Sequence, residues 1–310
     1  MMRKTLLLLL TIVGSMSALA IDDNTVEVVY NGSTATVTVA NNIASVITVS
    51  SETSSHVVIT SSTESAKISY ILSGTTDNGS FQLNGKYKCE ISLNGLTLTN
   101  PAGPALNIQN GKNTEISAKK DKVNTLADGK NEDYKGCIHS TGHLEFKGKG
   151  TLNIVGNSQH AIYSKEYTEL KNLTLNITGA QKDGIHCKEY FLMESGTVTI
   201  SNTGDDGIQC ELDGETSTGE IEDHEDEDSG NVYQLDGKLT IKDYAGEPIK
   251  ADGEIIFRGG THDFGATGIE HVSDSKFQVS SNNAIYDLSG RRVITPSHGV
   301  YIQNGKKFIK

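Results

Sequence analysis

The middle of the chain repeats one short turn-and-strand pattern at a nearly constant step. The clearest copies are Asp183-Gly184-Ile185-His186-Cys187 and Asp206-Gly207-Ile208-Gln209-Cys210. The step from Ala161 to Gly184 is 23 residues, and the step from Gly184 to Gly207 is again 23. A single repeat of this length cannot bury its own apolar face, whereas stacked repeats can, so this spacing is typical of a solenoid.

A second strand recurs with the same step and carries two apolar residues spaced by two. Side chains two apart in a strand lie on the same face, so each pair is expected to point into a common core. These pairs are Leu152/Ile154, Leu175/Ile177, Val198/Ile200 and Leu239/Ile241. The fold class that follows is all-β, with short parallel strands stacked about 4.8 Å apart.

Alignment of the repeats predicts which side chains point inward. An apolar ladder is expected at Leu106, Ile138, Ile162, Ile185, Ile208, Ile249 and Ile269, and a ladder of small residues at Ser140, Ser164, Cys187, Cys210 and Ala251. Stacked parallel neighbours seldom have the geometry of a disulfide, so Cys187 and Cys210 are interpreted as buried thiols. The residues between the two ladders should form an outward polar row, namely His139, Tyr163, His186, Gln209, Lys250 and Glu270.

The ends of the chain differ from this repeat. Residues 1–20 carry basic residues, an apolar run and the sequence Ala18-Leu19-Ala20, which together predict a signal peptide. Residues 21–72 are expected to be an N-terminal β cap or the first coils, and residues 73–283 the β-helix, with an acidic insertion at 211–230. No later segment is apolar enough for a membrane span. We therefore expect a protein that is secreted or held at the cell surface, with the periplasm as an alternative.

The charge of the chain argues against nucleic acid as a partner. The formal net charge is −12 with only 27 Lys and Arg, and neutralising a phosphate backbone needs a basic stripe. No Ser/His/Asp, phosphate-loop or nucleotide motif points to another enzyme class. The chain contains no Trp, so a flat aromatic platform for sugars is not expected. We expect a monomer.

The repeats resemble the bacterial carbohydrate-binding β-helix proteins related to polysaccharide lyase family 9. The resemblance rests on Lys182-Asp183-Gly184-Ile185-His186, on Asp205-Asp206-Gly207-Ile208 and on Leu93-Asn94-Gly95-Leu96-Thr97-Leu98, and covers about residues 25–275. It implies a single-stranded right-handed parallel β-helix, a pectate-lyase-like solenoid. Known members bind cellulose and acidic, pectin-like sugars and hold calcium. Residues 284–310 are similar to type IX secretion sorting tails.

The acidic residues of the repeats form the candidate metal site. Asp183 and Asp206 occupy equivalent positions in adjacent repeats, about 5 Å apart, with Asp205 beside them. Calcium accepts several carboxylate oxygens in flexible geometry and would relieve the repulsion of these charges. The resemblance places its calcium ligands on Asp183, Asp205 and Asp206, with Asp213 as a weaker addition. The alternative is that these Asp residues serve only as turn residues, or that Asp205 pairs with Lys182.

Three functions are consistent with these features. The first is non-catalytic, calcium-assisted binding of acidic, pectin-like or plant cell-wall glycans, with Tyr163, His186, Gln209 and Lys250 as hydrogen-bonding residues. The second is a calcium-dependent polysaccharide lyase, for which Lys250 and Lys188 are candidate bases. The third is a structural surface or matrix protein. The tripeptides Lys165-Glu166-Tyr167 and Lys188-Glu189-Tyr190 are interpreted as exposed charges beside a packed Tyr.

Overall fold

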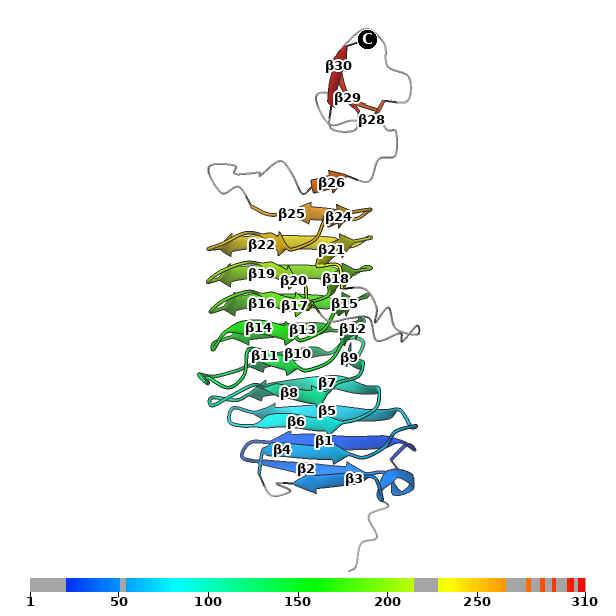
Figure 1. Cartoon of the computed structure of the whole chain (residues 1–310). Helices are drawn as coiled ribbons and strands as arrows, with labels where there is room; N and C mark the ends of the chain where they lie inside the picture. Colours follow the sequence, from blue (N-terminus) through cyan, green and yellow to red (C-terminus); the bar gives the residue numbers. More distant parts are fainter. Residues whose placement is uncertain are drawn as a thin grey trace, which may run out of the picture.

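The strands within residues 25–263 stack one above another along a single axis (Figure 1). The computed structural model describes residues 21–50, 54–214 and 228–265, and the backbone of five short strands beyond them: β26 (Phe277–Val279), β27 (Ile285–Asp287), β28 (Arg292–Val293), β29 (Val300–Gln303) and β30 (Lys306–Ile309). The predicted signal peptide lies outside the described residues, as do Ile269, Glu270 and most of the acidic insertion. Within the described residues, the one helix is a single 3-10 turn, η1 (Asn41–Ile43).

A nine-stranded sheet forms one side of the stack. Its order is β23-β20-β17-β14-β11-β8-β6-β4-β3, so each strand hydrogen-bonds to its equivalent in the next repeat. The pairs from β4 to β23 are parallel, and β3 pairs antiparallel with β4. The strands are β3 (Ile47–Ser50), β4 (His56–Ser61), β6 (Ser80–Gly85), β8 (Leu106–Asn110), β11 (Gly136–Ser140), β14 (His160–Ser164), β17 (Ile185–Lys188), β20 (Ile208–Glu211) and β23 (Ile249–Ala251).

A 17-stranded sheet covers the remaining sides and divides after its longest strand, β7 (Cys89–Thr99). The first half of β7 pairs with β9 and the second half with β10. One branch continues through β9 (Thr114–Ala118), β12 (Leu144–Gly148), β15 (Thr168–Leu170), β18 (Tyr190–Met193), β21 (Asn231–Gln234), β24 (Ile255–Phe257) and β26. The other continues through β10 (Val123–Ala127), β13 (Thr151–Gly156), β16 (Thr174–Ala180), β19 (Thr197–Thr203), β22 (Lys238–Tyr244) and β25 (Thr261–Asp263).

The first strands show how the stack begins. β1 (Thr25–Asn31) pairs in parallel with β5 (Ile68–Thr76), and β2 (Thr34–Val39) pairs antiparallel with β1. The predicted N-terminal segment 21–72 therefore contains strands of the parallel ladders as well as antiparallel ones. Its predicted boundary at residue 72 falls inside β5, because the Val/Thr/Ser alternation of this segment continues into a strand of the main stack.

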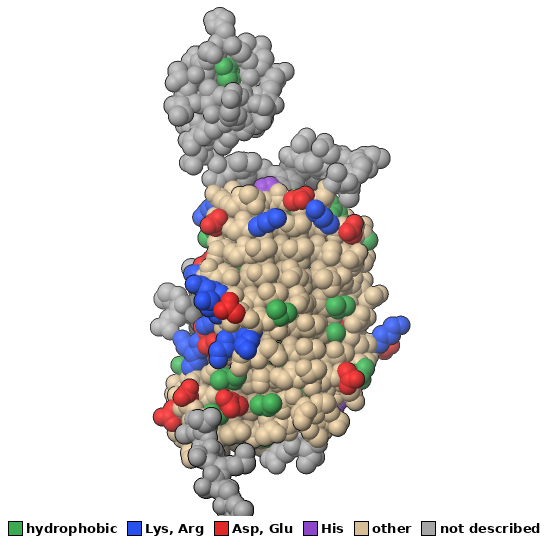
Figure 2. All heavy atoms as spheres, turned by 180° about the vertical axis from the view of Figure 1, so that it is seen from behind, with side chains coloured by type: hydrophobic (Ala, Val, Ile, Leu, Met, Phe, Trp, Pro, Cys, Tyr) green, Lys and Arg blue, Asp and Glu red, His purple; other side chains and the backbone are tan. Residues whose placement is uncertain are grey.

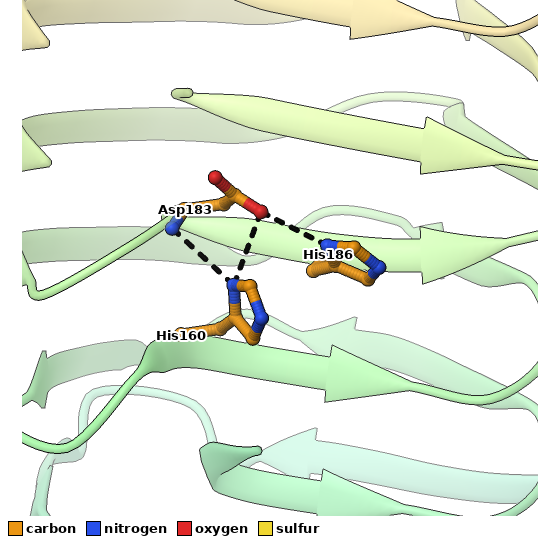
Figure 3. Close-up of side chains that lie close together, drawn as sticks. All are labelled: His160, Asp183 and His186. Atoms are coloured by element: carbon orange, nitrogen blue, oxygen red, sulfur yellow. Dashed lines mark hydrogen bonds and ion pairs between the residues drawn. The ribbon is translucent and has the colours of Figure 1, made fainter. Parts of the chain in front are cut away.

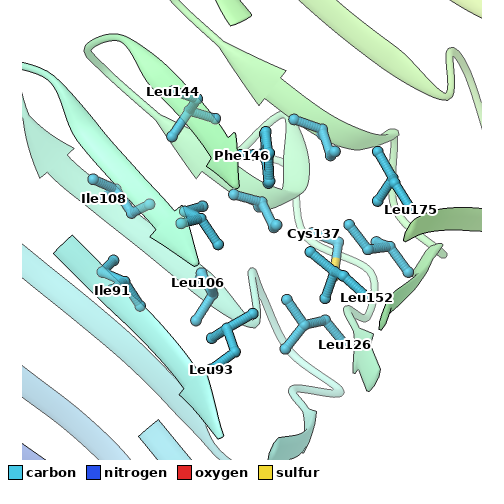
Figure 4. Close-up of a cluster of buried hydrophobic side chains, with 14 of the residues drawn as sticks. Ile91, Leu93, Leu106, Ile108, Leu126, Cys137, Leu144, Phe146, Leu152 and Leu175 are labelled. Atoms are coloured by element: carbon cyan, nitrogen blue, oxygen red, sulfur yellow. The ribbon is translucent and has the colours of Figure 1, made fainter. Parts of the chain in front are cut away.

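The inward ladders have the predicted register. Ile185 pairs with Ile162 on one side and with Ile208 on the other, and Cys187 pairs with Cys210. Every described member of both ladders is buried, and the four Cys are free thiols. Figure 4 shows inward side chains from several strands, Leu106, Leu126 and Leu152 among them, meeting in one core. Burying an Ile or Leu contributes about 1.5–3 kcal/mol.

The glycine of the repeated motif is required by close packing. A Cβ on Gly184 would lie 2.6 Å from Ile200 Cγ2, and a Cβ on Gly207 would lie 2.4 Å from Ile241 Cγ2. The Asp-Gly-Ile turn therefore passes directly against the apolar ladder of a neighbouring sheet. The Asp that precedes each glycine therefore lies just before the first residue of a strand in the nine-stranded sheet.

The outer faces of the stack differ in charge. Figure 2 shows a broad face on which charged side chains lie mainly at the margins. The outward rows of the strands β13, β16 and β19 are uncharged and join Asn153, Asn176 and Thr199 in register. Clusters of acidic and histidine side chains lie instead at the two ends of the strands of the nine-stranded sheet.

Candidate functional site

The outward row on the nine-stranded sheet has the predicted register. His139 pairs with Tyr163, Tyr163 with His186, His186 with Gln209, and Gln209 with Lys250. The first three side chains stack as rings, with centroids 5.3 Å apart for His139–Tyr163 and 5.4 Å apart for Tyr163–His186.

The expectation that the whole row offers accessible polar groups is wrong for Tyr163 and His186. Both side chains are buried, because each ring is covered by the next and Lys135 Nζ lies 3.2 Å from the Tyr163 hydroxyl. His139 and Gln209 are half-buried and Lys250 is exposed, so the open hydrogen-bonding groups lie toward the two ends of the described row. Gln209 Nε2 donates to Glu211 Oε1 at 2.7 Å.

Asp183 lies two residues before β17, and both of its carboxylate oxygens have hydrogen-bond or ion-pair partners. Its Oδ2 lies 2.9 Å from His186 Nδ1 and 3.1 Å from His160 Nδ1, and the Asp183 backbone N–H donates to His160 Nδ1 at 3.3 Å (Figure 3). Its Oδ1 accepts the backbone N–H of Asp206 at 3.0 Å. His160 occupies the position in its own repeat that Asp183 occupies in the next, two residues before the laddered Ile. The structure thus surrounds this carboxylate with two imidazoles, which the repeat alignment did not predict.

Burial and these contacts shift the pKa values of Asp183 and His160. Burial raises the pKa of Asp183, but the hydrogen bonds from His160 and His186 outweigh it and hold the pKa well below its usual range. Burial lowers the pKa of His160, and the neighbouring Asp183 opposes that shift only in part. Asp183 is therefore a permanently ionised, buried carboxylate at neutral pH.

Asp206 repeats the position of Asp183 but has different partners. Its Oδ1 accepts the backbone N–H of Glu247 at 2.7 Å, whereas its buried Oδ2 has no hydrogen-bond partner. Lys250 Nζ lies 3.5 Å from that oxygen, with the Lys250 side chain 50% exposed and Asp206 only 2% exposed. Burial and the charge of Asp205 raise the pKa of Asp206, although the Glu247 and Lys250 contacts oppose them, and the charge of Asp206 raises the pKa of Lys250.

The three predicted metal residues do come together. Asp183, Asp205 and Asp206 each offer a carboxylate oxygen, and these atoms lie within 4.8 Å of one another. A Cβ at Gly246 would lie 2.3 Å from Asp206 Oδ1 and 2.7 Å from Asp205 Oδ1, so this glycine leaves the space into which both carboxylates turn. The turn interpretation is also supported, because Asp183 and Asp206 each accept a backbone N–H from the following repeat.

The structure places Lys188 and Asp213 away from these carboxylates. Lys188 is the last residue of β17 and its Nζ lies 2.6 Å from Asp213 Oδ1. Five residues of extended chain separate Lys188 from Asp183, about 16 Å. The prediction that Lys188 and Asp213 lie near the acidic pair is therefore wrong, since the start of the acidic insertion carries Asp213 to the far end of the strand.

A second cluster lies at that far end and was missed. His143 follows β11, Glu166 follows β14 and Glu189 follows β17. His143 Nε2 lies 3.9 Å from Glu166 Oε2 and 3.6 Å from Glu189 Oε2, and Glu189 Oε2 accepts the Tyr167 backbone N–H at 3.0 Å. The sequence signal was present: Glu166 and Glu189 are 23 residues apart, like the Asp pair.

The interpretation of the two Lys-Glu-Tyr tripeptides is confirmed for tyrosine and wrong for Glu189. Tyr167 and Tyr190 are buried and stack at 4.8 Å, but Glu189 is buried too. Its backbone has φ = 63°, which turns the side chain toward His143 rather than toward solvent. Burial, together with the hydrogen bond and charge of Glu166, raises the pKa of Glu189 to about 9.

Comparison with known proteins defines the wider context. No helix in the described part of the chain is long and apolar enough to cross a membrane. A solved structure, a polysaccharide lyase-like protein from C. thermocellum determined as a gadolinium derivative, matches with a TM-score of 0.60 at 19% identity, covering 76% of this chain and 99% of that one. No curated protein matches the chain. The model of one family, described as carbohydrate-binding domain-containing protein, matches residues 53–307, and the chain belongs to that family.

Proposed function

We propose that this chain is an exported, non-catalytic polysaccharide-binding protein that uses calcium to bind acidic, pectin-like glycans. The membership of a carbohydrate-binding family supports the polysaccharide partner. The scaffold we propose is a right-handed parallel β-helix, in keeping with the parallel ladders of the sheets. The binding surface is the outer face of the nine-stranded sheet from Tyr163 to Lys250.

The observation that carries the calcium proposal is the buried Asp206 Oδ2, which has no hydrogen-bond partner. Its contact with Lys250 is a long ion pair of 3.5 Å, and a buried carboxylate oxygen that lacks a hydrogen bond is costly, which favours a further ligand at this oxygen. The Asp183 and Asp205 carboxylates lie beside it within 4.8 Å, and all the donors in this set are oxygens, which calcium prefers. This donor set fits calcium.

The roles of the individual residues follow from their contacts. Asp206 and Asp205 would hold the ion with Asp183, whose carboxylate is oriented by His160 and His186. When bound, calcium supplies positive charge that attracts the carboxylates of a uronate chain. Lys250 reaches into solvent from the same place and binds sugar hydroxyls or carboxylates. Gln209 adds an amide, and Tyr163 and His186 form the packed base beneath them.

The experiment compares the wild type with Asp206→Asn. Asparagine retains an oxygen for the Glu247 N–H and replaces Oδ2 by the amide nitrogen, which cannot ligate calcium and carries no negative charge. We expect calcium binding by calorimetry in the wild type and at least about tenfold weaker binding in the variant. Polygalacturonate should retain the wild type with calcium and release it with chelator. Equal retention with and without chelator would refute the calcium bridge.

A polysaccharide lyase remains the alternative, and the lysines give it no specific support. Ion pairs with Asp213 and Asp206 raise the pKa values of Lys188 and Lys250, so both are protonated at neutral pH, whereas a general base needs a lowered pKa. Unsaturated product absorbing in the ultraviolet after incubation with polygalacturonate would establish the lyase instead.

We further propose export through residues 1–20 and surface attachment through residues 284–310. The described strands of the tail pair antiparallel in the order β28-β27-β29-β30, which separates it from the parallel stack. Fractionation of cells that express the full chain, or the chain without residues 284–310, tests both statements. Retention of the truncated chain at the cell surface would refute the role of the tail.

A further inference from the structure

We propose that His143, Glu166 and Glu189 form a second metal site, specific for a divalent transition metal such as Zn²⁺. The site lies at the opposite ends of the same strands that carry Asp183 and Asp206. It is independent of the calcium and glycan proposals, because it shares no residue with them.

The spacing of the donor atoms is the first argument. His143 Nε2 lies 3.6 Å from Glu189 Oε2 and 3.9 Å from Glu166 Oε2. Both distances are too long for hydrogen bonds. Tetrahedral Zn²⁺ with bonds of about 2.0–2.2 Å separates its ligands by about 3.3–3.6 Å. The two His143–carboxylate distances are therefore within a few tenths of an ångström of those in such a site, and all three ligand atoms lie within 4.8 Å of one another.

The donor atoms of the Asp183 cluster lie closer together. There, His160 and His186 lie 3.1 and 2.9 Å from the same carboxylate oxygen, so nitrogen and oxygen are already joined by hydrogen bonds. At His143, nitrogen and oxygens face one another at the spacing of metal ligands. The repeat thus brings His and acidic residues together twice, and in the second arrangement the His–carboxylate distances exceed hydrogen-bond length.

The site is also held in position before any ion binds. The His143 ring stacks on Tyr167 with centroids 4.2 Å apart and planes 11° apart, and the Tyr167 backbone N–H fixes Glu189 Oε2. The Glu166 side chain is 18% exposed, so an ion has a route from solvent. Pre-positioned ligands lose little conformational entropy on binding, which favours affinity.

The donor set selects the kind of metal. One imidazole nitrogen with two carboxylates suits Zn²⁺ and its neighbours, whereas calcium takes oxygen ligands only. Burial, the hydrogen bond with Glu166 and the charge of Glu166 raise the pKa of Glu189 to about 9, so a bound cation would displace the proton that this carboxyl group holds at neutral pH. Since the three ligands follow β11, β14 and β17, a bound ion would tie three successive repeats together.

The test titrates the mature chain, residues 21–310, with Zn²⁺ against a chromogenic chelator. The wild type should bind one equivalent that is lost, or weakened at least about tenfold, in both His143→Asn and Glu166→Gln. The control is His56→Asn, because His56 lies on β4 and the one side-chain hydrogen bond described for it is to Ser80. That variant should bind as the wild type does. Zinc should raise the melting temperature of the wild type and the control, but not of the two site variants.

Two site variants are used so that a folding defect in one of them does not decide the test. Glu166 is partly exposed and Gln is isosteric with it, so Glu166→Gln carries the test if His143→Asn does not fold. Zinc binding of equal strength in the wild type and in a folded Glu166→Gln would overturn the proposal, as would no binding by the wild type. The Asp206→Asn calcium measurement is a separate experiment, so the two proposals fail independently.

Discussion

Replacing Asp183 by Ala is the most informative single perturbation of the nine-stranded sheet. The carboxylate is buried. Its Oδ2 contacts the His160 and His186 rings, and its Oδ1 accepts a hydrogen bond from the Asp206 N–H. Removing one partner from a buried charged network costs about 3–5 kcal/mol, because the remaining groups stay buried without their partner. For a chain of this size such a loss lowers the melting temperature by roughly 6–10 °C.

The pH dependence of this effect has a definite sign. The folded-state pKa of Asp183 is lowered from its usual value of 3.8, so its contribution to stability is complete above that value and is lost as the pH falls through the lower folded-state pKa. The gap in melting temperature between the wild type and Asp183→Ala should therefore narrow as the pH falls below 4.

Two measurements check this prediction. Calorimetry compares the variant with Asp133→Ala, which removes an exposed Asp and should melt as the wild type does. Amide hydrogen exchange should accelerate at Asp206, whose N–H loses its acceptor, and stay unchanged at Lys238, whose N–H binds Gly196 in another sheet. A loss of less than about 1 kcal/mol, or a gap that does not change below pH 4, would show that Asp183 is not the charged centre of this network.

Three further predictions concern the same stack. Lys250→Gln should tighten calcium binding several-fold, because it removes a positive charge that lies 3.5 Å from Asp206 Oδ2 and repels the ion. Two unit charges 4 Å apart repel by about 1 kcal/mol in water, and the double charge of calcium doubles this energy. Unchanged calorimetric affinity would place the ion elsewhere. Ile185→Ala should cost about 2–5 kcal/mol in the free energy of unfolding through a cavity in the buried ladder, and a urea-unfolding cost below 1 kcal/mol would contradict its position there. Cys187 and Cys210 should react with a thiol reagent only after unfolding, and rapid reaction of the native protein would show that these thiols are not buried.

The ladders were predictable because a strand has a strict alternation of faces. Once Ile185 is aligned with Ile162 and Ile208, His186 between Ile185 and Cys187 must point the other way. The structure pairs these residues as the alignment requires. The same reasoning brought Asp183 near Asp206, since equivalent positions of adjacent strands lie about 5 Å apart.

Which side chains of the outward row on the nine-stranded sheet are exposed to solvent could not be predicted in the same way. Alternation shows that Tyr163 and His186 point outward, but burial depends on what lies over them. Ring stacking and the Lys135 side chain, which comes from a loop between β10 and β11, cover these residues. An outward position on a sheet is therefore not equivalent to an exposed one.

The sequence by itself determined the repeat, the ladders and the equivalence of Asp183 with Asp206, because these depend only on a constant step and a two-residue alternation. Only the tertiary structure decided which side chains meet where strands begin and end. Turn conformation and the insertion place Lys188 on Asp213 and turn Glu189 toward His143. These contacts depend on backbone angles and side-chain rotamers at the turns, where the repeat varies in length and no periodicity constrains direction.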